Sequence, residues 1–317
     1  MPSDIRDPLV PDIHAEHSEH RVKQAPLRTT RETIDSYLLI APLMLLLFVF
    51  ILYPVLSNLY YGLTKWKGMG AAVFIGLENY ATMIRDEKFW ISLKNTGILI
   101  LFVPLGVLLP LVLAAILRMG LKGWSLFRAL IYLPNILGYV IIGLVFNIIL
   151  RKTGPLNAVL SAVGLRAYAL DWLNKSSLAI VSLGLVFVVW IRLGFGCIYF
   201  LAAMSGIDEN LYDAARIDGA GWWRIFRNVT IPSVRFSIEF FVVLYFIEIF
   251  ARAFPFIYTF TRGGPGFGTF TLEYGIYNAG FVAFNLGYAS AWATVLFILC
   301  SIVAIAQVRL MTGSRDE

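Results

Sequence analysis

The sequence predicts an all-α membrane protein with about six transmembrane helices, and its composition and its apolar runs carry that prediction. Hydrophobic residues make up 59% of the 317 residues and charged residues only 15%, whereas about a quarter of the residues in a soluble domain are charged. The mean hydropathy is +0.75. The apolar runs are long enough to cross a bilayer, which takes roughly 20 residues of helix.

Six apolar runs qualify as spans. Pro104 and Pro110 predict a kink in the second span, because proline removes a backbone donor inside a helix. The runs together define a transmembrane domain over residues 36–310. They cover about residues 37–60, 97–117, 129–150, 178–204, 234–260 and 286–308.

The two ends of the chain are polar. Residues 1–35 are rich in charge, proline and histidine, so we expect a disordered tail, and residues 311–317 form a second short tail. His14, His17 and His20 lack further ligands nearby, so we expect a solvated segment and no metal site. The first apolar run begins too late and is too long for a signal peptide.

The distribution of Lys and Arg predicts the orientation. Six spans place both termini on one side of the membrane. The segments on that side carry 14 Lys and Arg, against 10 in the other loops. Because positive residues collect on cytoplasmic loops, we expect both tails and the 205–233 loop to be cytoplasmic. The net charge of +6 therefore requires no nucleic acid.

A polar segment, residues 208–232, separates the fourth and fifth spans. Asp208 can cap a helix start, and Glu209 suits the positive end of the helix dipole. Pro232 is expected to end the helix. Gly219 allows either one amphipathic helix or two short helices joined at residues 218–220, whose small tip a partner's backbone can approach.

This segment resembles the EAA motif of permease subunits of bacterial ABC importers. It reads Asp-Ala-Ala from Asp213, then three residues, Gly219, nine residues, Val229, one residue and Ile-Pro. Asp213 stands where the family usually has Glu. The resemblance implies a coupling loop over residues 205–233 that docks on an ATP-binding subunit; the alternative is a helix lying on the membrane surface. The implied coupling residues are Asp213, Ala214, Ala215, Arg216, Asp218, Gly219, Ala220 and Pro232.

Two shorter motifs extend the resemblance over about residues 36–310. Residues 76–80, GLENY, are similar to a sequence in the first external loop of sugar-type permeases. Residues 261–266, TRGGPG, resemble the T-x-G-G-P of a permease type found in carbohydrate and glycerol-3-phosphate importers. Gly263, Gly264 and Pro265 predict an external turn; a phosphate-binding loop is disfavoured because no Lys-Ser/Thr follows. The resemblance implies a MetI-like fold of the type I ABC importers.

Polar side chains inside spans are costly and are candidates for the substrate path. Asn and Tyr can hydrogen-bond sugar hydroxyls, and Trp can stack on a sugar ring. Glu248 and Arg252 are spaced to pair on a helix. The same residues could equally hold helices together. The candidates are Asn135, Tyr139, Asn147, Trp190, Arg192, Tyr245, Glu248 and Arg252.

The hypothesis is one permease subunit of an ATP-driven importer for a sugar or sugar-like solute in the bacterial cytoplasmic (inner) membrane. The resemblance implies a second related permease, two ATP-binding subunits and an extracytoplasmic solute-binding protein. The sequence has no P-loop and no catalytic or metal constellation, so we expect no enzyme and no cofactor in this chain, with ATP and Mg in the partner subunits.

Three alternatives remain at this stage. The same machinery could carry a phosphorylated polyol such as glycerol-3-phosphate, attracted by Arg192 or Arg252. An ion-coupled secondary transporter would favour an internal repeat and intramembrane carboxylates, but there is no clear repeat and only Glu239 and Glu248 qualify. A structural or channel-forming protein would not need the central loop.

Overall fold

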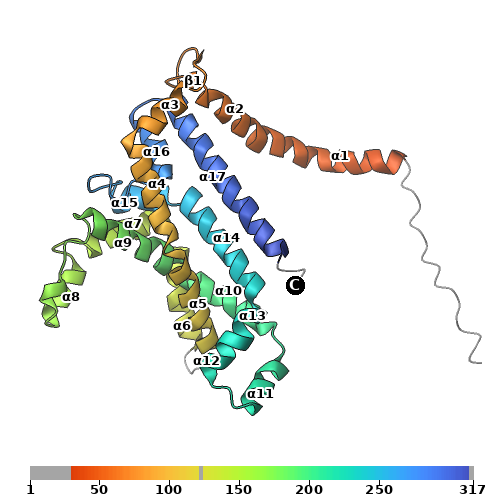
Figure 1. The fold of residues 1–317 in the computed structure, drawn as a ribbon, viewed down its shortest axis with the longest axis vertical. Coiled ribbons are helices and arrows are strands. Elements are labelled where there is room, and N and C mark those ends of the chain that lie inside the picture. Colours follow the sequence, from red (N-terminus) through yellow and green to blue (C-terminus); the bar gives the residue numbers. More distant parts are fainter. Residues whose placement is uncertain (1–29, 121–123, 314–317) are drawn as a thin grey trace, which may run out of the picture. The chain divides into compact units, whose positions relative to one another are not determined.

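A computed structural model describes residues 30–120 and 124–313, and most of this part is helical (Figure 1). Residues 1–29 of the predicted tail, with its three histidines, and residues 314–317 lie outside the described residues, whereas residues 30–35, also predicted as tail, are part of a helix that begins at Thr30. The chain separates into two units, residues 1–54 and 55–317, which we describe separately.

The helices alternate with short turns along the chain. They are α1 (Thr30–Leu47), α2 (Tyr53–Gly62), α3 (Glu78–Arg85), α4 (Glu87–Ile100), α5 (Val103–Leu117), α6 (Trp124–Ile136), α7 (Tyr139–Ile149), α8 (Pro155–Ala162), α9 (Ser176–Leu183), α10 (Ile191–Ser205), α11 (Glu209–Ile217), α12 (Trp222–Ile225), α13 (Ile231–Ser233), α14 (Arg235–Ala251), α15 (Phe254–Phe260), α16 (Leu272–Tyr277) and α17 (Leu286–Gly313). Strands β1 (Thr64–Lys65) and β2 (Val73–Phe74) form one antiparallel hairpin.

The first span is a continuous helix. Residues Tyr37–Gly62 run through α1, a π-helical turn at Phe48–Leu52, and α2, and their mean hydropathy is 2.7. None of its most apolar stretch is buried within the chain itself. An apolar helix of this length needs lipid or another protein around it.

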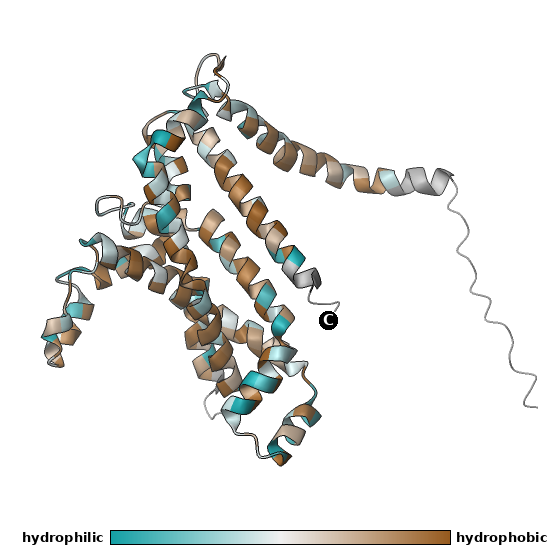
Figure 2. Ribbon diagram, viewed as in Figure 1, coloured by the Kyte–Doolittle hydropathy of each residue, from teal (hydrophilic) through white to brown (hydrophobic). Residues whose placement is uncertain are grey.

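The larger unit holds the other five predicted spans, and two of them are broken. Three are not sharply bent, at Glu87–Leu117, Ser176–Ser205 and Leu286–Arg309, although a two-residue turn between α4 and α5 interrupts the first of them just before Pro104. The third predicted span is α6 and α7, bent by 101°, and the fifth is α14 and α15, bent by 56°. The prediction of six spans therefore holds when each bent pair counts as one span. Apolar residues cover these helices (Figure 2).

Each bend has a local cause. Between α6 and α7, Gly138 adopts an extended conformation, with φ −67° and ψ 148°, so the helix restarts in a new direction. Between α14 and α15, Arg252 leaves helical geometry, and Pro255 sits in the first turn of the next helix. A proline there has no N–H to give to the preceding turn, which suits the start of a helix and not its interior.

Small residues let α10 approach its neighbours. A Cβ on Gly194 would lie 1.9 Å from the carbonyl oxygen of Ile131 in α6. A Cβ on Gly196 would lie 2.7 Å from Phe241 and 2.9 Å from Pro110 of α5. Lipid tails are as apolar as the helices, so the hydrophobic effect does not drive helices together inside a membrane. Close packing of this kind stabilises helix pairs instead.

The GLENY segment has a structural role. Its Asn79 is buried, and the side-chain amide donates to the carbonyl oxygens of Gly62 and Thr64, both at 2.9 Å. These bonds fix the end of α2 and the β1 strand against α3. In the larger unit α14 and α17 also lie side by side (Figure 1).

The glycine contact gives a test of this packing. Gly194→Ala should destabilise the protein by about 1–3 kcal/mol, because the new methyl group meets backbone that cannot rotate away. The midpoint temperature of thermal unfolding in detergent should fall by several degrees. The matched control is Gly97→Ala, where a Cβ meets nothing within 4 Å. Equal unfolding temperatures for both variants would contradict this account.

Candidate functional site

The 205–233 loop forms two short helices and not one long one. Asp208 caps α11, and its carboxylate accepts the Asn210 N–H at 3.0 Å. The chain then turns at Gly219, whose φ of +72° suits glycine, and re-enters a helix at α12. This part of the chain lies at one end of the larger unit (Figure 1).

Pro232 does not end the helix as the sequence predicted. It lies in the first turn of α13, which follows directly on a π-helical turn at Phe226–Thr230. Hydrogen bonds in a π-helical turn span five residues and not four. The path can therefore stay helical although proline has no N–H to donate. The helical path ends two residues later, at Val234, before α14 begins.

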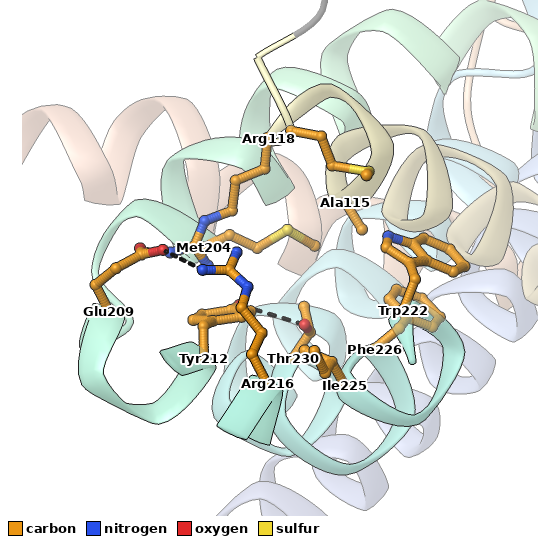
Figure 3. A pocket seen from close by; sticks show the side chains of 11 residues that line it. Ala115, Arg118, Met204, Glu209, Tyr212, Arg216, Trp222, Ile225, Phe226 and Thr230 are labelled. Atoms are coloured by element: carbon orange, nitrogen blue, oxygen red, sulfur yellow. Dashed lines mark hydrogen bonds and ion pairs between the residues drawn. The ribbon is translucent and has the colours of Figure 1, made fainter. Parts of the chain in front are cut away.

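Helix α11 exposes most of its surface and buries one residue, Tyr212. The Tyr212 hydroxyl lies 3.2 Å from the Thr230 hydroxyl. Its ring is covered by the Arg118 guanidinium, 3.9 Å from the ring centre. Arg118 follows α5 and also pairs with Glu209, with Nη2 to Oε2 at 2.7 Å (Figure 3). Arg118 is not among the coupling residues expected from the sequence.

A cavity of about 220 Å³ lies beside this contact, between the end of α5 and the loop (Figure 3). Its walls are mostly apolar, and Trp222 stacks on Phe226 with ring centres 5.3 Å apart. Arg216 lies at the mouth and bonds to Asp213 at 2.8 Å. The cavity shows that α11 is not packed tightly onto the spans.

The predicted coupling residues occupy the outer side of the loop. Most of them are exposed, and nothing lies within 4 Å of a Cβ built on Gly219. A partner protein can therefore reach the turn directly. The exposed members are Asp213, Ala214, Arg216, Asp218, Gly219 and Pro232, and Ala215 and Ala220 are half-buried.

The second polar feature is a buried ion pair inside the membrane domain. Glu248 of α14 is 3% exposed. It pairs with Arg192 of α10 and accepts a hydrogen bond from the Tyr139 hydroxyl at the start of α7. The pairing of Glu248 with Arg252 suggested by their spacing is therefore not formed, because Arg252 is exposed at the bend where α14 ends.

Within the described part of the chain, the other candidate path residues do not bond to the ion pair. Asn147 donates to the Phe260 carbonyl at 2.6 Å and thus ties α7 to α15. Trp190 packs edge-on against Phe146. Tyr245 donates to the Gly106 carbonyl at 2.7 Å. Asn135 is half-buried just before the α6–α7 break.

The sequence analysis missed a third acid, Glu273 at the start of α16. Its carboxylate accepts the Phe254 N–H at 2.7 Å and so caps α15. Burial raises the pKa of Glu273 to about 7, although hydrogen bonds from Phe254 and Ala253 oppose the rise. The sequence signal that could have identified Glu273 is a single acidic residue among mostly apolar neighbours.

The predicted turn at Gly263, Gly264 and Pro265 forms and is tied to neighbouring spans. The Gly264 N–H bonds to the Thr261 carbonyl at 3.0 Å. Ser176, at the start of α9, donates to the Pro265 carbonyl at 3.0 Å. The loop is therefore held in place.

Spans broken around a buried ion pair, with a protruding two-helix loop at one end, are the architecture of a membrane transporter. Residues 106–313 match the family described as binding-protein-dependent transport system inner membrane component. The chain belongs to this family. The prediction of an ABC importer permease with a MetI-like fold is confirmed.

Named relatives cover nearly the whole chain. The lactose transport system permease protein LacF of Rhizobium radiobacter is 33% identical over 90% of this chain and 95% of its own length. The diacetylchitobiose uptake permease NgcF of Streptomyces coelicolor is 30% identical over 84% of this chain and 80% of its own. A bacterial ABC transporter that imports alginate shares the fold, with a TM-score of 0.75, 22% identity, and coverage of 89% and 96% of the two chains.

The buried ion pair gives a stability test. Glu248→Ala leaves Arg192 charged and without its carboxylate, which should cost about 3–5 kcal/mol. Replacing both ions, in Arg192→Met/Glu248→Leu, should recover much of that loss, since no charge remains buried. Thermal unfolding of the purified protein in detergent measures both. A double variant as unstable as Glu248→Ala would count against the pairing.

Proposed function

We propose that this chain is one permease subunit of an ATP-driven importer for a sugar or sugar-like solute. It works with a second related permease, two ATP-binding subunits that hold ATP and Mg, and an extracytoplasmic solute-binding protein. The observation that carries the proposal is the 205–233 loop, because its two helices and glycine turn project residues that the chain does not use for its own packing.

The loop suits docking to an ATP-binding subunit. A turn without side-chain bulk at Gly219 lets a partner's backbone come close. Asp213 and Arg216, which precede the turn on α11 and pair with each other, add exposed charges near it. Closure of the ATP-binding subunits then moves the loop, and the spans rock between inward-facing and outward-facing states. On this topology both termini and the loop are cytoplasmic, as the distribution of Lys and Arg favours.

The broken spans suit a translocation path. Tyr139, Arg192 and Glu248 come from three different helices and meet next to both breaks. Ionisable groups at such a place are costly unless paired, and broken helices in transporters line the path. The solute passes these groups when the spans move. The sugar assignment is supported by the relatives, named for lactose and diacetylchitobiose transport.

The test is purification from the native host with a C-terminal tag, followed by identification of the co-purifying proteins and reconstitution in liposomes. We expect an ATP-binding subunit and a second permease, and uptake of a mono- or disaccharide that needs ATP and the binding protein. Glycerol-3-phosphate belongs in the same panel. Recovery of the chain alone, with solute uptake driven by an ion gradient, would overturn the proposal.

The turn at Gly219 gives a mutational prediction. Gly219→Trp should abolish uptake while the chain still inserts in the membrane, because the large side chain blocks the partner's approach. The matched control is Gly164→Trp, a site that also has positive φ and open space around its Cβ. Uptake, membrane insertion and co-purification of the ATP-binding subunit are measured for both. Normal uptake by the Gly219 variant would remove the docking role.

A further inference from the structure

Helix α11 is separated from both neighbouring spans by breaks in the helix. Residues 206–208 lie between α10 and α11, and Asp208 is extended, with ψ 124°. On the other side the turn at Gly219 interrupts the path to α12. Helix α11 is thus not continuous with the fourth or the fifth span. A movement of α11 therefore needs a non-covalent connection to reach the membrane.

We propose that Arg118 is the positioning residue that makes this connection, and that it carries the movement of α11 into the second span. The inference rests on the proposed function, since it assigns a role within the same coupling. It adds α5 to the elements that respond to α11, beside the helical path into the fifth span, which α11 already reaches through the contact between the Tyr212 and Thr230 hydroxyls.

The Arg118 contacts hold α11 at two points. The guanidinium covers Tyr212, the one side chain that α11 buries. It also binds Glu209, in the first turn of the same helix. Its Nη1 is buried, with no hydrogen-bond partner in the described part of the chain. The Arg118 head group thus lies mainly against α11, and its side chain is 22% exposed.

The two contacts differ in strength. Glu209 is exposed, at 62%, so its ion pair with Arg118 contributes little by itself. Tyr212 is 6% exposed, and a cation over a ring shielded from water interacts more strongly. A planar guanidinium can stack on a ring in a way that an ammonium cannot. The shape of Arg118 therefore counts as well as its charge.

From α5 the connection continues to the buried ion pair. The Gly106 carbonyl of α5 accepts the Tyr245 hydroxyl of α14 at 2.7 Å, and both residues are buried. A Cβ on Gly106 would lie 2.7 Å from that hydroxyl, so the two helices touch there. Tyr245 stands three residues before Glu248, on the same side of α14. Contacts thus run from α11 through Arg118, α5 and Tyr245 to Glu248.

The experiment uses the complete transporter in liposomes, with ATP hydrolysis and sugar uptake measured on the same preparation. Arg118→Gln should lower uptake per ATP hydrolysed about tenfold, within the usual range of coupling between sites. The ATP-binding subunits should still co-purify. The ratio for Arg118→Lys should lie between those of the wild type and Arg118→Gln, because lysine keeps the charge but cannot stack on the Tyr212 ring as a planar group. Tyr245→Phe should also lower the ratio, by breaking the link from α5 to α14.

The control is Arg235→Gln, which breaks an ion pair with Glu239, 2.9 Å long, on the exposed side of α14. Its ratio should equal that of the wild type. Glu209→Gln should have a small effect that does not add to Arg118→Gln, because both changes remove the same contact.

An unchanged ratio in Arg118→Gln would overturn the inference. If the Arg118→Gln complex fails to assemble, Arg118→Lys provides the test. A wild-type ratio of uptake to ATP hydrolysis in Arg118→Lys would then overturn the inference equally. Absence of ATP-dependent uptake by the wild-type complex is a different result, because it rejects the proposed function itself.

Discussion

The breaks in two spans impose the main physical constraint on this fold. A broken helix frees backbone groups, and an apolar membrane offers no water to satisfy them. The protein supplies partners from distant segments, because Glu273 binds the Phe254 N–H and Asn147 binds the Phe260 carbonyl. Both ends of α15 are thereby held. The helix that follows the bend at Arg252 is therefore held by these contacts, and Pro255 lies in its first turn.

The buried ion pair lies next to the breaks in both bent spans. Glu248 lies one turn before the end of α14, and Tyr139 begins α7 after the other break. Arg192 comes from the unbroken fourth span. A pair of ions inside an apolar core is weak evidence for stability, because desolvation offsets the attraction. A place where two bent helices meet a straight one is, however, where a rearrangement can exchange such contacts.

The loop and the membrane cluster are linked by packing and not by sequence neighbourhood. Helix α11 is short, and few of its atoms are buried. Helix α5 lies against α10 and reaches α14. Packed side chains that run through rigid helices are one route by which distant sites can be coupled energetically.

The amino-acid sequence by itself determined the class of fold, the six apolar runs and the position of the polar loop between the fourth and fifth runs. Composition and the length of apolar runs fix these, because a bilayer demands about 20 apolar residues per helix. Gly219 and the residues around it also marked the turn, since positive φ favours glycine. The spacing of Glu248 and Arg252, in contrast, predicted the wrong partner.

Only the tertiary structure decided which distant side chains meet. Spacing of four residues predicts a pair only if the helix continues, and α14 ends between Glu248 and Arg252. Arg192, the partner of Glu248, is 56 residues away from it in sequence, and Arg118 lies 91 residues from Glu209. Such contacts depend on how the helices pack, which local pattern does not encode. For the same reason Pro232, an expected stop, lies inside a helical path that a π-helical turn makes possible.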